Sequence, residues 1–389
     1  MSNGNSDQRT YDYNPLTGLY DVTAAALTSQ YTNKQFQYSS ALGFNKTTAK
    51  LTLSAYANLQ NIELKGTNMG NNQWNEINRN YLSFLPRASV SYKAGKNTTY
   101  SINFSSSANT PSLQNLQPVQ NNNNPLYIRT GNPDLKIANN YSIQLGFNTF
   151  DTKTNSSASY RLSYGLTFNA FSTARDFDSK TGVSSVRPIN VDGNNNISLS
   201  GSFGRPTGIK GLRVNYGFSA SNRRYINFVN TVQNTTSDLT AAITASLNYA
   251  HEESLNIAFN NRSSYTVNNN SIQATTNNSY FSFNNTANIS YEFIKTWRFN
   301  VDVGQQSFAR QNAGLNNNVV IVNAGLQKYF LEKNQLNVQL KAFDLFDQNS
   351  GISRTISNNQ IEDTQVNNLR RYFSVRLTYK INKIVKKTP

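Results

Sequence analysis

The sequence predicts an all-β protein, a transmembrane antiparallel up-and-down β-barrel of about 16 strands. Three observations lead to this prediction. Polarity alternates with period two, the alternating runs are long, and short and long connections follow one another in order. Because successive side chains of a strand point to opposite faces, such alternation separates an apolar face from a polar one.

The alternation is clearest in three runs, at 159–170, 281–293 and 373–381. Arg161 and Arg376 lie in the middle of two of these runs, on the polar side. An arginine that faced lipid at the membrane midplane would cost about 2–4 kcal/mol, so both side chains are expected to point into the lumen. The apolar sides consist of Tyr160, Leu162, Tyr164, Leu166, Phe168 and Ala170, then Phe281, Phe283, Ala287, Ile289, Tyr291 and Phe293, and finally Phe373, Val375, Leu377, Tyr379 and Ile381.

The runs and their connections have the lengths expected of a membrane barrel. A tilted strand needs about 9–11 residues to cross a bilayer, whereas strands of soluble sheets usually have about 5–6. Outer-membrane barrels alternate short periplasmic turns with long extracellular loops. The predicted tight connections are 45–49, 93–97, 151–156, 204–210, 250–253, 294–296 and 331–335. The predicted long connections are 65–80, 105–139, 174–187, 225–237, 264–278, 308–317 and 345–369, and a segment near 19–31 completes the strand count.

The composition supports the same class. Only 14% of the 389 residues are charged and 37% are hydrophobic, whereas a soluble surface usually has about 25–35% charged residues. The 44 Tyr and Phe residues exclude a disordered chain. The 62 Asn residues suit a lumen and loops that are hydrated by uncharged polar side chains. No apolar run approaches the roughly 20 residues of a membrane helix, and no signal peptide is visible at the N-terminus. The chain therefore either stays in the cytoplasm or lacks its true beginning.

Two other folds would also alternate. A soluble β-sandwich predicts shorter strands, mixed loop lengths and a charged outer face. A β-solenoid predicts a fixed repeat of about 20–30 residues, and no repeated motif is present. Both alternatives fit the sequence less well than the barrel does.

The sequence offers little for covalent chemistry, so no enzyme activity, catalytic residue, metal site or cofactor is predicted. Without Cys, there is no thiolate ligand or Cys nucleophile, and His251 is the only histidine, at a predicted tight turn. Asp344 and Asp347 could form a carboxylate pair, but their spacing at a strand end gives no reason to expect an acid–base pair and favours a structural role.

The net charge of +16 raises the question of nucleic-acid binding. The basic residues are scattered rather than arranged in a stripe, so no nucleic-acid partner is predicted. The only local concentrations are Arg223-Arg224, Arg370-Arg371 and Lys386-Lys387. Such residues suit outer-membrane lipid headgroups or tune the ion preference of a lumen.

Residues 121–136, with the sequence NNNNPLYIRTGNPDLK, form a distinctive polar segment. Its prolines exclude a central strand, and GNPD has the composition of a turn. Long ordered loops on a rigid scaffold often carry binding sites, so the segment either binds a ligand or folds only to cover the mouth of the barrel.

Six motifs are distributed along the chain: PSLQNLQP at 111–118, NPL at 124–126, GNPDL at 131–135, NVDG at 190–193, FDLFDQN at 343–349 and RYFSVRLTY at 371–379. Together they resemble those of the TonB-dependent-receptor-like outer-membrane β-barrel family of Bacteroidota. The similarity extends over about residues 15–384.

The resemblance implies a location in the cell outer membrane and a relation to receptors that import nutrients with energy from the TonB complex. Family members normally have a signal peptide, a plug and 22 strands, so this chain is expected to correspond to the C-terminal barrel portion without the plug. The expected organisation is a disordered or truncated segment at 1–15, the barrel at 16–384 and a basic tail at 385–389.

Three functions remain open: a receptor or transporter that takes up a nutrient ligand, a passive porin-like channel, and a surface-binding barrel that transports nothing. The ligand could be an oligosaccharide, a siderophore or a peptide. The TonB complex is an expected partner only if a plug exists upstream of Met1.

Overall fold

A computed structural model describes residues 2–8, 11–23, 29–70, 73–118, 120–252, 254–272, 277–310, 317–331, 334–349, 352–357, 360–366 and 369–381. Nearly all of them are in strands, so the predicted all-β class is confirmed. The described part contains one helix, α1 (Leu113–Leu116), and no helix long and apolar enough to cross a membrane. The expected basic tail at 385–389, with Lys386 and Lys387, lies outside the described residues.

Twenty strands form one sheet, and sixteen of these make up its continuous antiparallel wall. The other four strands of the sheet are short and lie in two segments between the wall strands. The wall strands are β1 (Ser2–Gln8), β4 (Ser29–Thr47), β5 (Leu51–Gly70), β6 (Gln73–Gly95), β7 (Thr98–Asn109), β10 (Ala138–Asp151), β11 (Ser156–Phe168), β14 (Asn194–Pro206), β15 (Leu212–Val229), β16 (Val232–His251), β17 (Leu255–Asn270), β18 (Asn278–Ile294), β19 (Trp297–Arg310), β20 (Asn317–Phe330), β21 (Leu336–Phe343) and β24 (Tyr372–Tyr379). The short strands are β8 (Gln120–Asn124), β9 (Tyr127–Thr130), β12 (Ala170–Phe177) and β13 (Ser184–Val191).

Two further hairpins stand apart from this sheet. They are β2 (Tyr11–Asn14) with β3 (Leu19–Thr23), and β22 (Ile352–Ser357) with β23 (Gln360–Gln365). β1 and β2 thus lie within the segment 1–15, for which the sequence predicted disorder or truncation.

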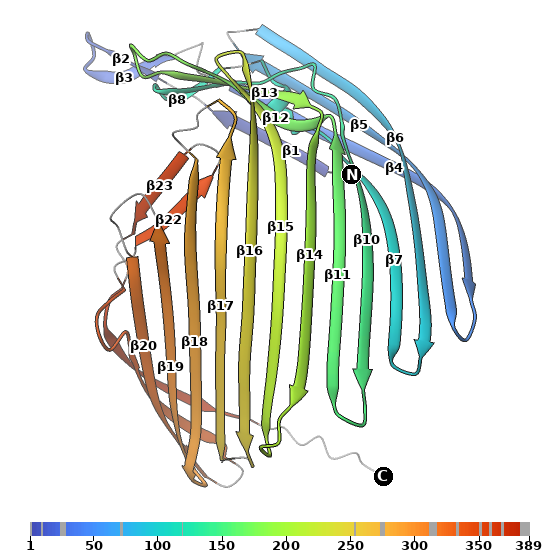
Figure 1. The fold of residues 1–389 in the computed structure, drawn as a ribbon. Coiled ribbons are helices and arrows are strands. Elements are labelled where there is room, and N and C mark those ends of the chain that lie inside the picture. Colours follow the sequence, from blue (N-terminus) through green and yellow to red (C-terminus); the bar gives the residue numbers. More distant parts are fainter. Residues whose placement is uncertain are drawn as a thin grey trace, which may run out of the picture.

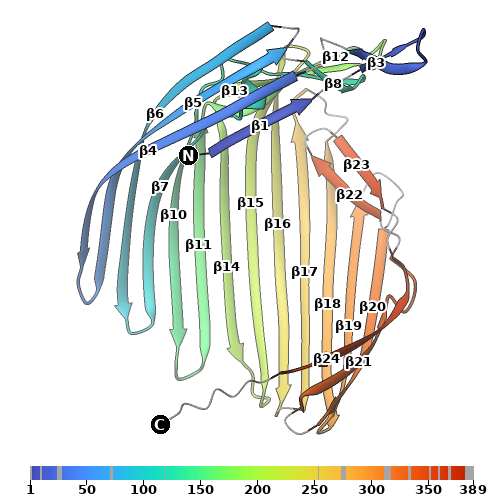
Figure 2. The ribbon, with the colours of Figure 1, turned by 180° about the vertical axis from the view of Figure 1, so that it is seen from behind.

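The wall is strongly curved but open. Strand pairing runs without interruption from β1 through β4 to β24, and no register joins β24 to β1 or β4 among the described residues. Figures 1 and 2 show the convex and concave sides, with β1 and β4 crossing the open side near the top and β21 and β24 near the bottom. The wall therefore has the predicted number of about 16 strands, but its sixteenth strand is β1 and not the segment near 19–31. Residues 19–23 of that segment form β3 in a separate hairpin. Closure of a barrel by these strands alone is not seen.

All seven predicted tight connections are confirmed, and those visible in Figure 1 lie at one end of the wall. The β10–β11 turn shows how the sequence forms such a connection. Asp151 accepts hydrogen bonds from the Lys153 backbone and the Thr154 hydroxyl, and Asn155 has a φ of 52°. Asn tolerates this left-handed conformation better than most residues, and Asp and Asn commonly form such local turns.

Two predicted long connections are instead extensions of strands. β5 and β6 pair up to Gly70↔Gln73, and β15 and β16 pair up to Val229↔Val232, so residues 65–80 and 225–237 are largely strand. The polar composition that indicated loops in fact belongs to strands that continue beyond the length needed to cross a bilayer, about 9–11 residues.

The prediction that one strand runs through Ala170 is wrong. β11 ends at Phe168, and Asn169 adopts a φ of 50° while its backbone N–H donates to the Asp192 carboxylate at 2.7 Å. The chain changes direction there, so Ala170 begins β12 and is buried with Val191 and Ile226 rather than lying on the outer face. A positive φ at Asn cannot be recognised from period-two alternation.

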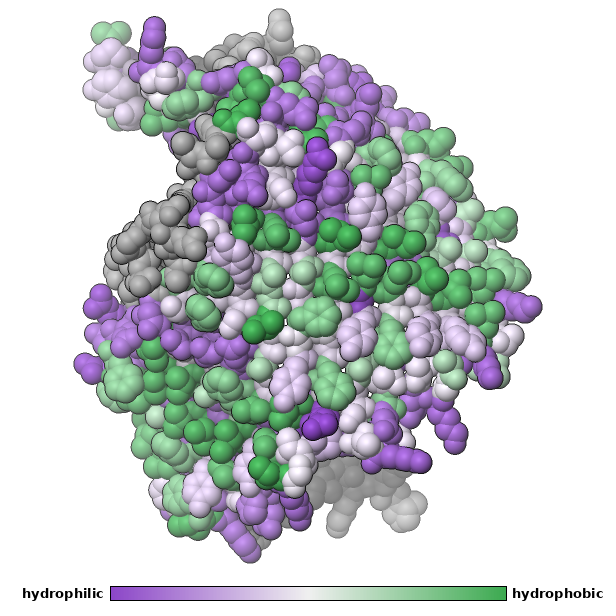
Figure 3. All heavy atoms as spheres, in the orientation of Figure 1, coloured by the Kyte–Doolittle hydropathy of each residue, from purple (hydrophilic) through white to green (hydrophobic). Residues whose placement is uncertain are grey.

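The two faces of the wall have opposite polarity. Tyr160, Leu162 and Tyr164 are exposed on one face, and Arg161 lies on the other, which confirms the predicted register. Arg376 likewise alternates with the exposed Val375 and Leu377. In Figure 3, the convex side is green and pale over the middle of the strands, and purple residues gather toward its two ends. Such a belt suits contact with lipid.

Candidate functional site

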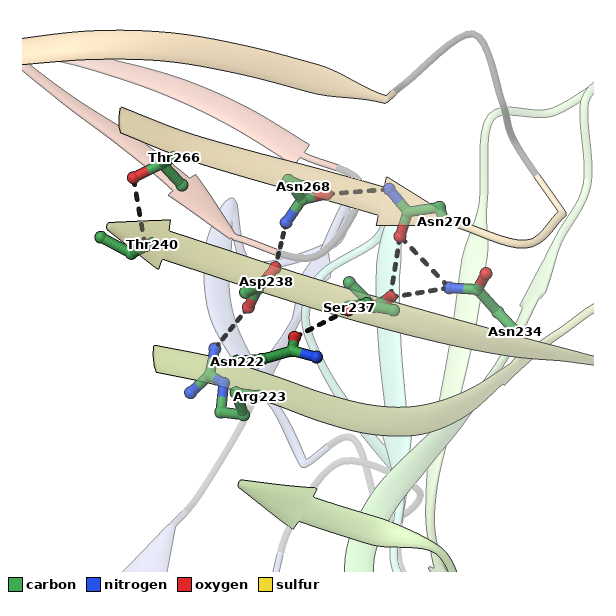
Figure 4. Close-up of polar contacts among 10 residues, drawn as sticks. Asn222, Arg223, Asn234, Ser237, Asp238, Thr240, Thr266, Asn268 and Asn270 are labelled. Carbon is green, nitrogen blue, oxygen red and sulfur yellow. Dashed lines mark hydrogen bonds and ion pairs between the residues drawn. The ribbon is translucent and has the colours of Figure 1, made fainter. Parts of the chain in front are cut away.

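A polar network lies on the inner face of β15, β16 and β17, nearer to the long connections than to the tight turns (Figure 4). The strand register places Arg223 opposite Asp238 and Asp238 opposite Asn268. Directly opposed residues share a face, so three neighbouring strands bring these side chains together. These residues alternate with the exposed outer residues Leu239 and Ile243 of β16.

The centre of the network is an ion pair supported by an amide. Arg223 Nη2 lies 2.9 Å from Asp238 Oδ2, and Asn268 Nδ2 donates to Asp238 Oδ1. The Arg223 guanidinium also lies 5.1 Å from the centre of the Tyr225 ring. Asp238 is mostly buried, whereas Arg223 remains 66% exposed and can therefore contact a solute in the lumen.

A chain of amides and a hydroxyl continues the network toward the end of the strands. Asn270 Nδ2 donates to Asn268 Oδ1 at 3.1 Å, and the Thr236 hydroxyl donates to Asn270 Oδ1 at 2.8 Å. Asn234, only 1% exposed, donates from Nδ2 to Thr236 Oγ1 at 3.2 Å. Hydrogen-bonded partners offset the cost of burying these polar groups and hold them in one arrangement.

Asn278 differs from these residues. It lies opposite Asn268 in the β17–β18 register and is buried, yet its Nδ2 and Oδ1 atoms have no hydrogen-bond partner within the described structure. A buried unpaired polar group costs about 1–3 kcal/mol. Next to a polar pocket, this amide is a candidate for pairing with water or a ligand.

A pocket of about 450 Å³ adjoins the ion pair. Arg223 and Asp238 line it together with amides, hydroxyls and one aromatic ring. A pocket of this size and polarity can hold a small hydrophilic solute through several hydrogen bonds. The principal lining residues are Asn196, Ser198, Ser221, Thr240, Thr266, Asn268 and Tyr280.

A second pocket of about 450 Å³ lies nearer the tight turns, on the inner face of β15 to β19. Its residues include Arg213, Asn288 and Asp302, and Asn288 Nδ2 donates to Asp302 Oδ1 at 2.8 Å. The inner face therefore carries a guanidinium, a carboxylate and amides near both ends of the same strands.

The segment 121–136 folds into the mouth and packs against the inner face of β5 and β6. Arg79 Nη2 donates to the carbonyl of Pro133 at 2.9 Å, and the Tyr81 hydroxyl donates to the carbonyl of Leu135 at 3.1 Å. Gly131 is required here, because a Cβ atom would lie 2.1 Å from the Gln117 carbonyl oxygen. These contacts favour the interpretation that the segment covers the mouth.

The NVDG motif joins this segment to the β12–β13 segment. Asn190 accepts from the backbone N–H of Lys136 at 2.8 Å and donates to the carbonyls of Lys136 at 3.1 Å and Asn169 at 2.7 Å. Gly193 has a φ of 101°, which an L side chain rarely adopts. NVDG therefore contacts Lys136, the residue that follows GNPDL, although the two motifs are distant in sequence.

The residues considered for chemistry occupy structural positions. His251 is exposed at the end of β16, with Nδ1 3.5 Å from the Tyr249 hydroxyl. Asp344 is buried, and its carboxylate accepts the backbone N–H groups of Gln348 at 3.0 Å and Asn349 at 2.9 Å. Within the described ranges, no three His, Asp or Glu residues form a group that could hold a metal ion.

The two basic pairs in the described part of the chain do not form basic patches. The members of the first pair lie on opposite faces of a strand, and those of the second contact a nearby aspartate. Arg223 faces the lumen, and the adjacent Arg224 belongs to the opposite face of β15. Arg370 lies 3.8 Å from Asp347, whose Oδ1 also accepts the backbone N–H of Arg371 at 3.2 Å. Neither pair contributes to a continuous basic surface.

Sequence reasoning did not single out the luminal network. Its signal was present as polar residues at alternate positions, Thr236, Asp238 and Thr240 in β16 and Thr266, Asn268 and Asn270 in β17. The sequence alone could not show which strands are neighbours, because the pairing depends on where each turn begins.

An up-and-down antiparallel wall with an apolar convex face and a polar concave face defines the class of transmembrane β-barrel proteins. The sequence matches the outer membrane protein beta-barrel family over residues 1–248 and again over 220–379, so the chain belongs to this family. Membership implies a location in the outer membrane.

Comparison with solved structures finds a distant similarity to FpvA of P. aeruginosa, in its complex with iron and a heterologous pyoverdine. The TM-score is 0.33 at 11% sequence identity, and the match covers 96% of this chain and 63% of that chain. The present chain thus spans less than two thirds of FpvA. No curated protein matches the sequence.

Proposed function

We propose that the protein is a receptor or transporter of the TonB-dependent receptor type. It takes up or binds a polar nutrient ligand through its extracellular loops and lumen. The observation that carries this proposal is the luminal pocket beside Arg223 and Asp238, with its exposed guanidinium and ordered amides. No group in the proposal performs covalent chemistry.

The composition of the pocket favours a hydrophilic ligand. The charges of Arg223 and Asp238 balance, and the remaining lining is mainly amide and hydroxyl, with apolar surface from Ile197 and the ring of Tyr280. Amides and hydroxyls can donate and accept hydrogen bonds, and an aromatic ring can cover an apolar face of a solute. Oligosaccharides, siderophores and peptides remain the candidate ligand classes.

A passive channel is the second candidate function. It is favoured by the second pocket around Arg213 and Asp302, because a solute could move along one polar face between the two sites. Two segments lie at the mouth, and we call them the mouth segments: the one with α1, β8 and β9, and the one with β12 and β13. The first of them packs against β5 and β6 and would restrict this path without forming a plug. A non-transporting surface barrel would use the outer loops alone.

Planar-bilayer recordings of the purified chain test the proposal. A receptor should show little open conductance and should bind one of the three ligand classes, with Asp238→Asn weakening binding at least tenfold, about 1.4 kcal/mol. Asp302→Asn at the second pocket is the matched control. Steady conductance without ligand selectivity would favour the passive channel, and an open frame for a plug upstream of Met1 would support coupling to the TonB complex.

A further inference from the structure

The tight turns at one end of the wall carry a regular series of lysines. Five of the seven turns contain one lysine each in a described position, and every one of these side chains is exposed. The ion pairs found in the described ranges include none of them. The five residues are Lys50, Lys96, Lys153, Lys210 and Lys295.

Four of these turns are consecutive along the wall. The hairpins β4–β5, β6–β7, β10–β11 and β14–β15 are neighbours in the sheet. Since adjacent strands lie about 4.8 Å apart, turns of successive hairpins are roughly 10 Å apart. The lysines therefore form a line that follows the rim, which we call the basic rim, rather than a compact patch.

Nearby acidic groups form no ion pair with the lysines of the basic rim in the described ranges. The carboxylate of Asp151 is engaged with the Thr154 hydroxyl and the Lys153 backbone, and Glu292 pairs with Arg298 at 3.0 Å. Glu252 lies in the next turn, where no lysine is present. Lys46 and Lys93, at the ends of neighbouring strands, are also exposed and add to the positive charge.

Aromatic side chains lie immediately above this end of the wall. Phe293 and Trp297 flank the turn of Lys295, with ring centres 6.3 Å apart. Lys328 Nζ lies 4.7 Å from the centre of the Trp297 ring and 4.8 Å from that of Phe330. Such aromatic belts mark the membrane–water interface, so the basic rim lies at the level of lipid headgroups or just beyond them.

We propose that the basic rim binds the phosphate groups of anionic phospholipids in the leaflet that faces the tight turns. Lysine is a flexible point charge suited to phosphate, and each lysine near an anionic membrane surface adds to the attraction. In the orientation usual for outer-membrane barrels, this leaflet is the periplasmic one. The linear arrangement at the interface fits a lipid surface better than it fits a single acidic protein or a cell-wall strand.

The test uses the full chain, folded into vesicles of phosphatidylethanolamine with about a quarter phosphatidylglycerol and then extracted gently for quantification of the retained lipid. The rim variant carries Lys50→Gln, Lys96→Gln, Lys153→Gln and Lys210→Gln. The matched control makes the same change in charge at the opposite end, with Gln at Lys34, Lys65, Lys136 and Lys180. Heat-modifiable gel migration shows that each variant is folded.

The wild type and the control should retain phosphatidylglycerol enriched at least about twofold over the vesicle, and the rim variant should retain it near the bulk ratio. The enrichment should also fall at 1 M salt, where the Debye length is about 3 Å. Equal enrichment in wild type and rim variant, or equal loss in rim variant and control, would overturn the proposal. The proposal would also fail if the rim variant lost binding to purified cell-wall sacculi while it still retained the phosphatidylglycerol.

The orientation can be checked independently, because the chain has no cysteine. The Thr152→Cys variant should react with a membrane-impermeant maleimide only after the outer membrane is permeabilised. Labelling in intact cells would place the rim at the cell surface and contradict the assignment to the periplasmic leaflet.

Discussion

The wall and the mouth of this protein use apolar residues in opposite ways. On the wall, Phe218 and Ile243 point outward and are exposed in the isolated chain. In the mouth, Leu113, Leu116 and Leu135 pack with Ile62 and Ile77 in a small buried core. Figure 1 places β8, β12 and β13 at the level of the upper ends of the central strands.

The difference follows from the solvent on each side. Wall strands in lipid are stabilised by complete backbone pairing, and their apolar side chains need no protein core. The mouth faces water, so its segments must bury apolar groups to remain ordered. The two regions should therefore respond differently to the same kind of mutation.

The largest effect is expected from Leu116→Ala in the mouth. Leu116 has no exposed surface, and truncating a buried Leu costs about 2–5 kcal/mol through lost contacts and the cavity left behind. Hydrogen exchange of the peptide covering 111–136 should accelerate strongly, while the heat-modifiable migration of the wall is retained. Leu126→Ala is the control, since Leu126 is 58% exposed in the same segment. Global unfolding by Leu116→Ala would show that mouth and wall are one cooperative unit.

A slightly smaller effect is expected from Ile243→Arg on the convex face. An arginine near the middle of the bilayer costs about 2–4 kcal/mol, so the stability of the folded barrel in vesicles should drop by this amount in urea titrations. Thr244→Arg, one position further on the same strand, should be tolerated better because its side chain faces the lumen. Equal destabilisation by both changes would contradict the assignment of faces.

The sequence predicted the wall far better than the mouth. Period-two alternation is a local property, so the faces around Tyr160 and Arg161 and all seven tight turns could be read from it. The core around Leu116 could not, because it brings together residues of β5, β6 and the α1 segment that have no periodic relation. The break at Asn169 depends on its contact with Asp192, which is 23 residues away.

The luminal network was less predictable from the sequence than the wall and more predictable than the mouth. Its polar positions follow the alternation that the sequence showed, but its specific partners depend on register. Asp238 meets Arg223 only because the β15–β16 turn falls at Asn230 and Thr231, both with positive φ. A turn shifted by one residue would have moved Asp238 to the lipid face.

The contact between the two mouth segments gives a third test. Asn190→Ala removes three hydrogen bonds and leaves the backbone of Lys136 unpaired, which should cost about 1–3 kcal/mol. Limited proteolysis should then cut the mouth segments faster, and the wall fragment should remain intact. Asn195→Ala, which removes a single local bond to the Gly193 carbonyl, should change the cleavage rate much less. Unchanged proteolysis of Asn190→Ala would mean that the apolar core alone holds the mouth.

The smallest effect should have the same sign in both regions, because it depends on hydrogen bonds within each local turn. Asp151 in a wall turn and Asp178 in the mouth each have a pKa lowered below the ordinary 3.8. For Asp151 the hydroxyl of Thr154 is the largest cause, followed by the backbone N–H of Lys153. For Asp178 the backbone N–H of Lys180 comes first, followed by the hydroxyl of Thr181.

Thr154→Ala should therefore raise the pKa of Asp151, and Thr181→Ala should raise that of Asp178, as followed by NMR of the carboxyl carbons in micelles. Because each folded pKa lies below its unfolded value, the ionised carboxylates stabilise the turns above pH 4, and this contribution is lost as the pH falls through the folded pKa. Equal shifts in both turns would mean that the hydroxyl bonds matter equally. An unchanged pKa of Asp178 in Thr181→Ala would show that the surroundings of the mouth, and not this hydroxyl, control its charge.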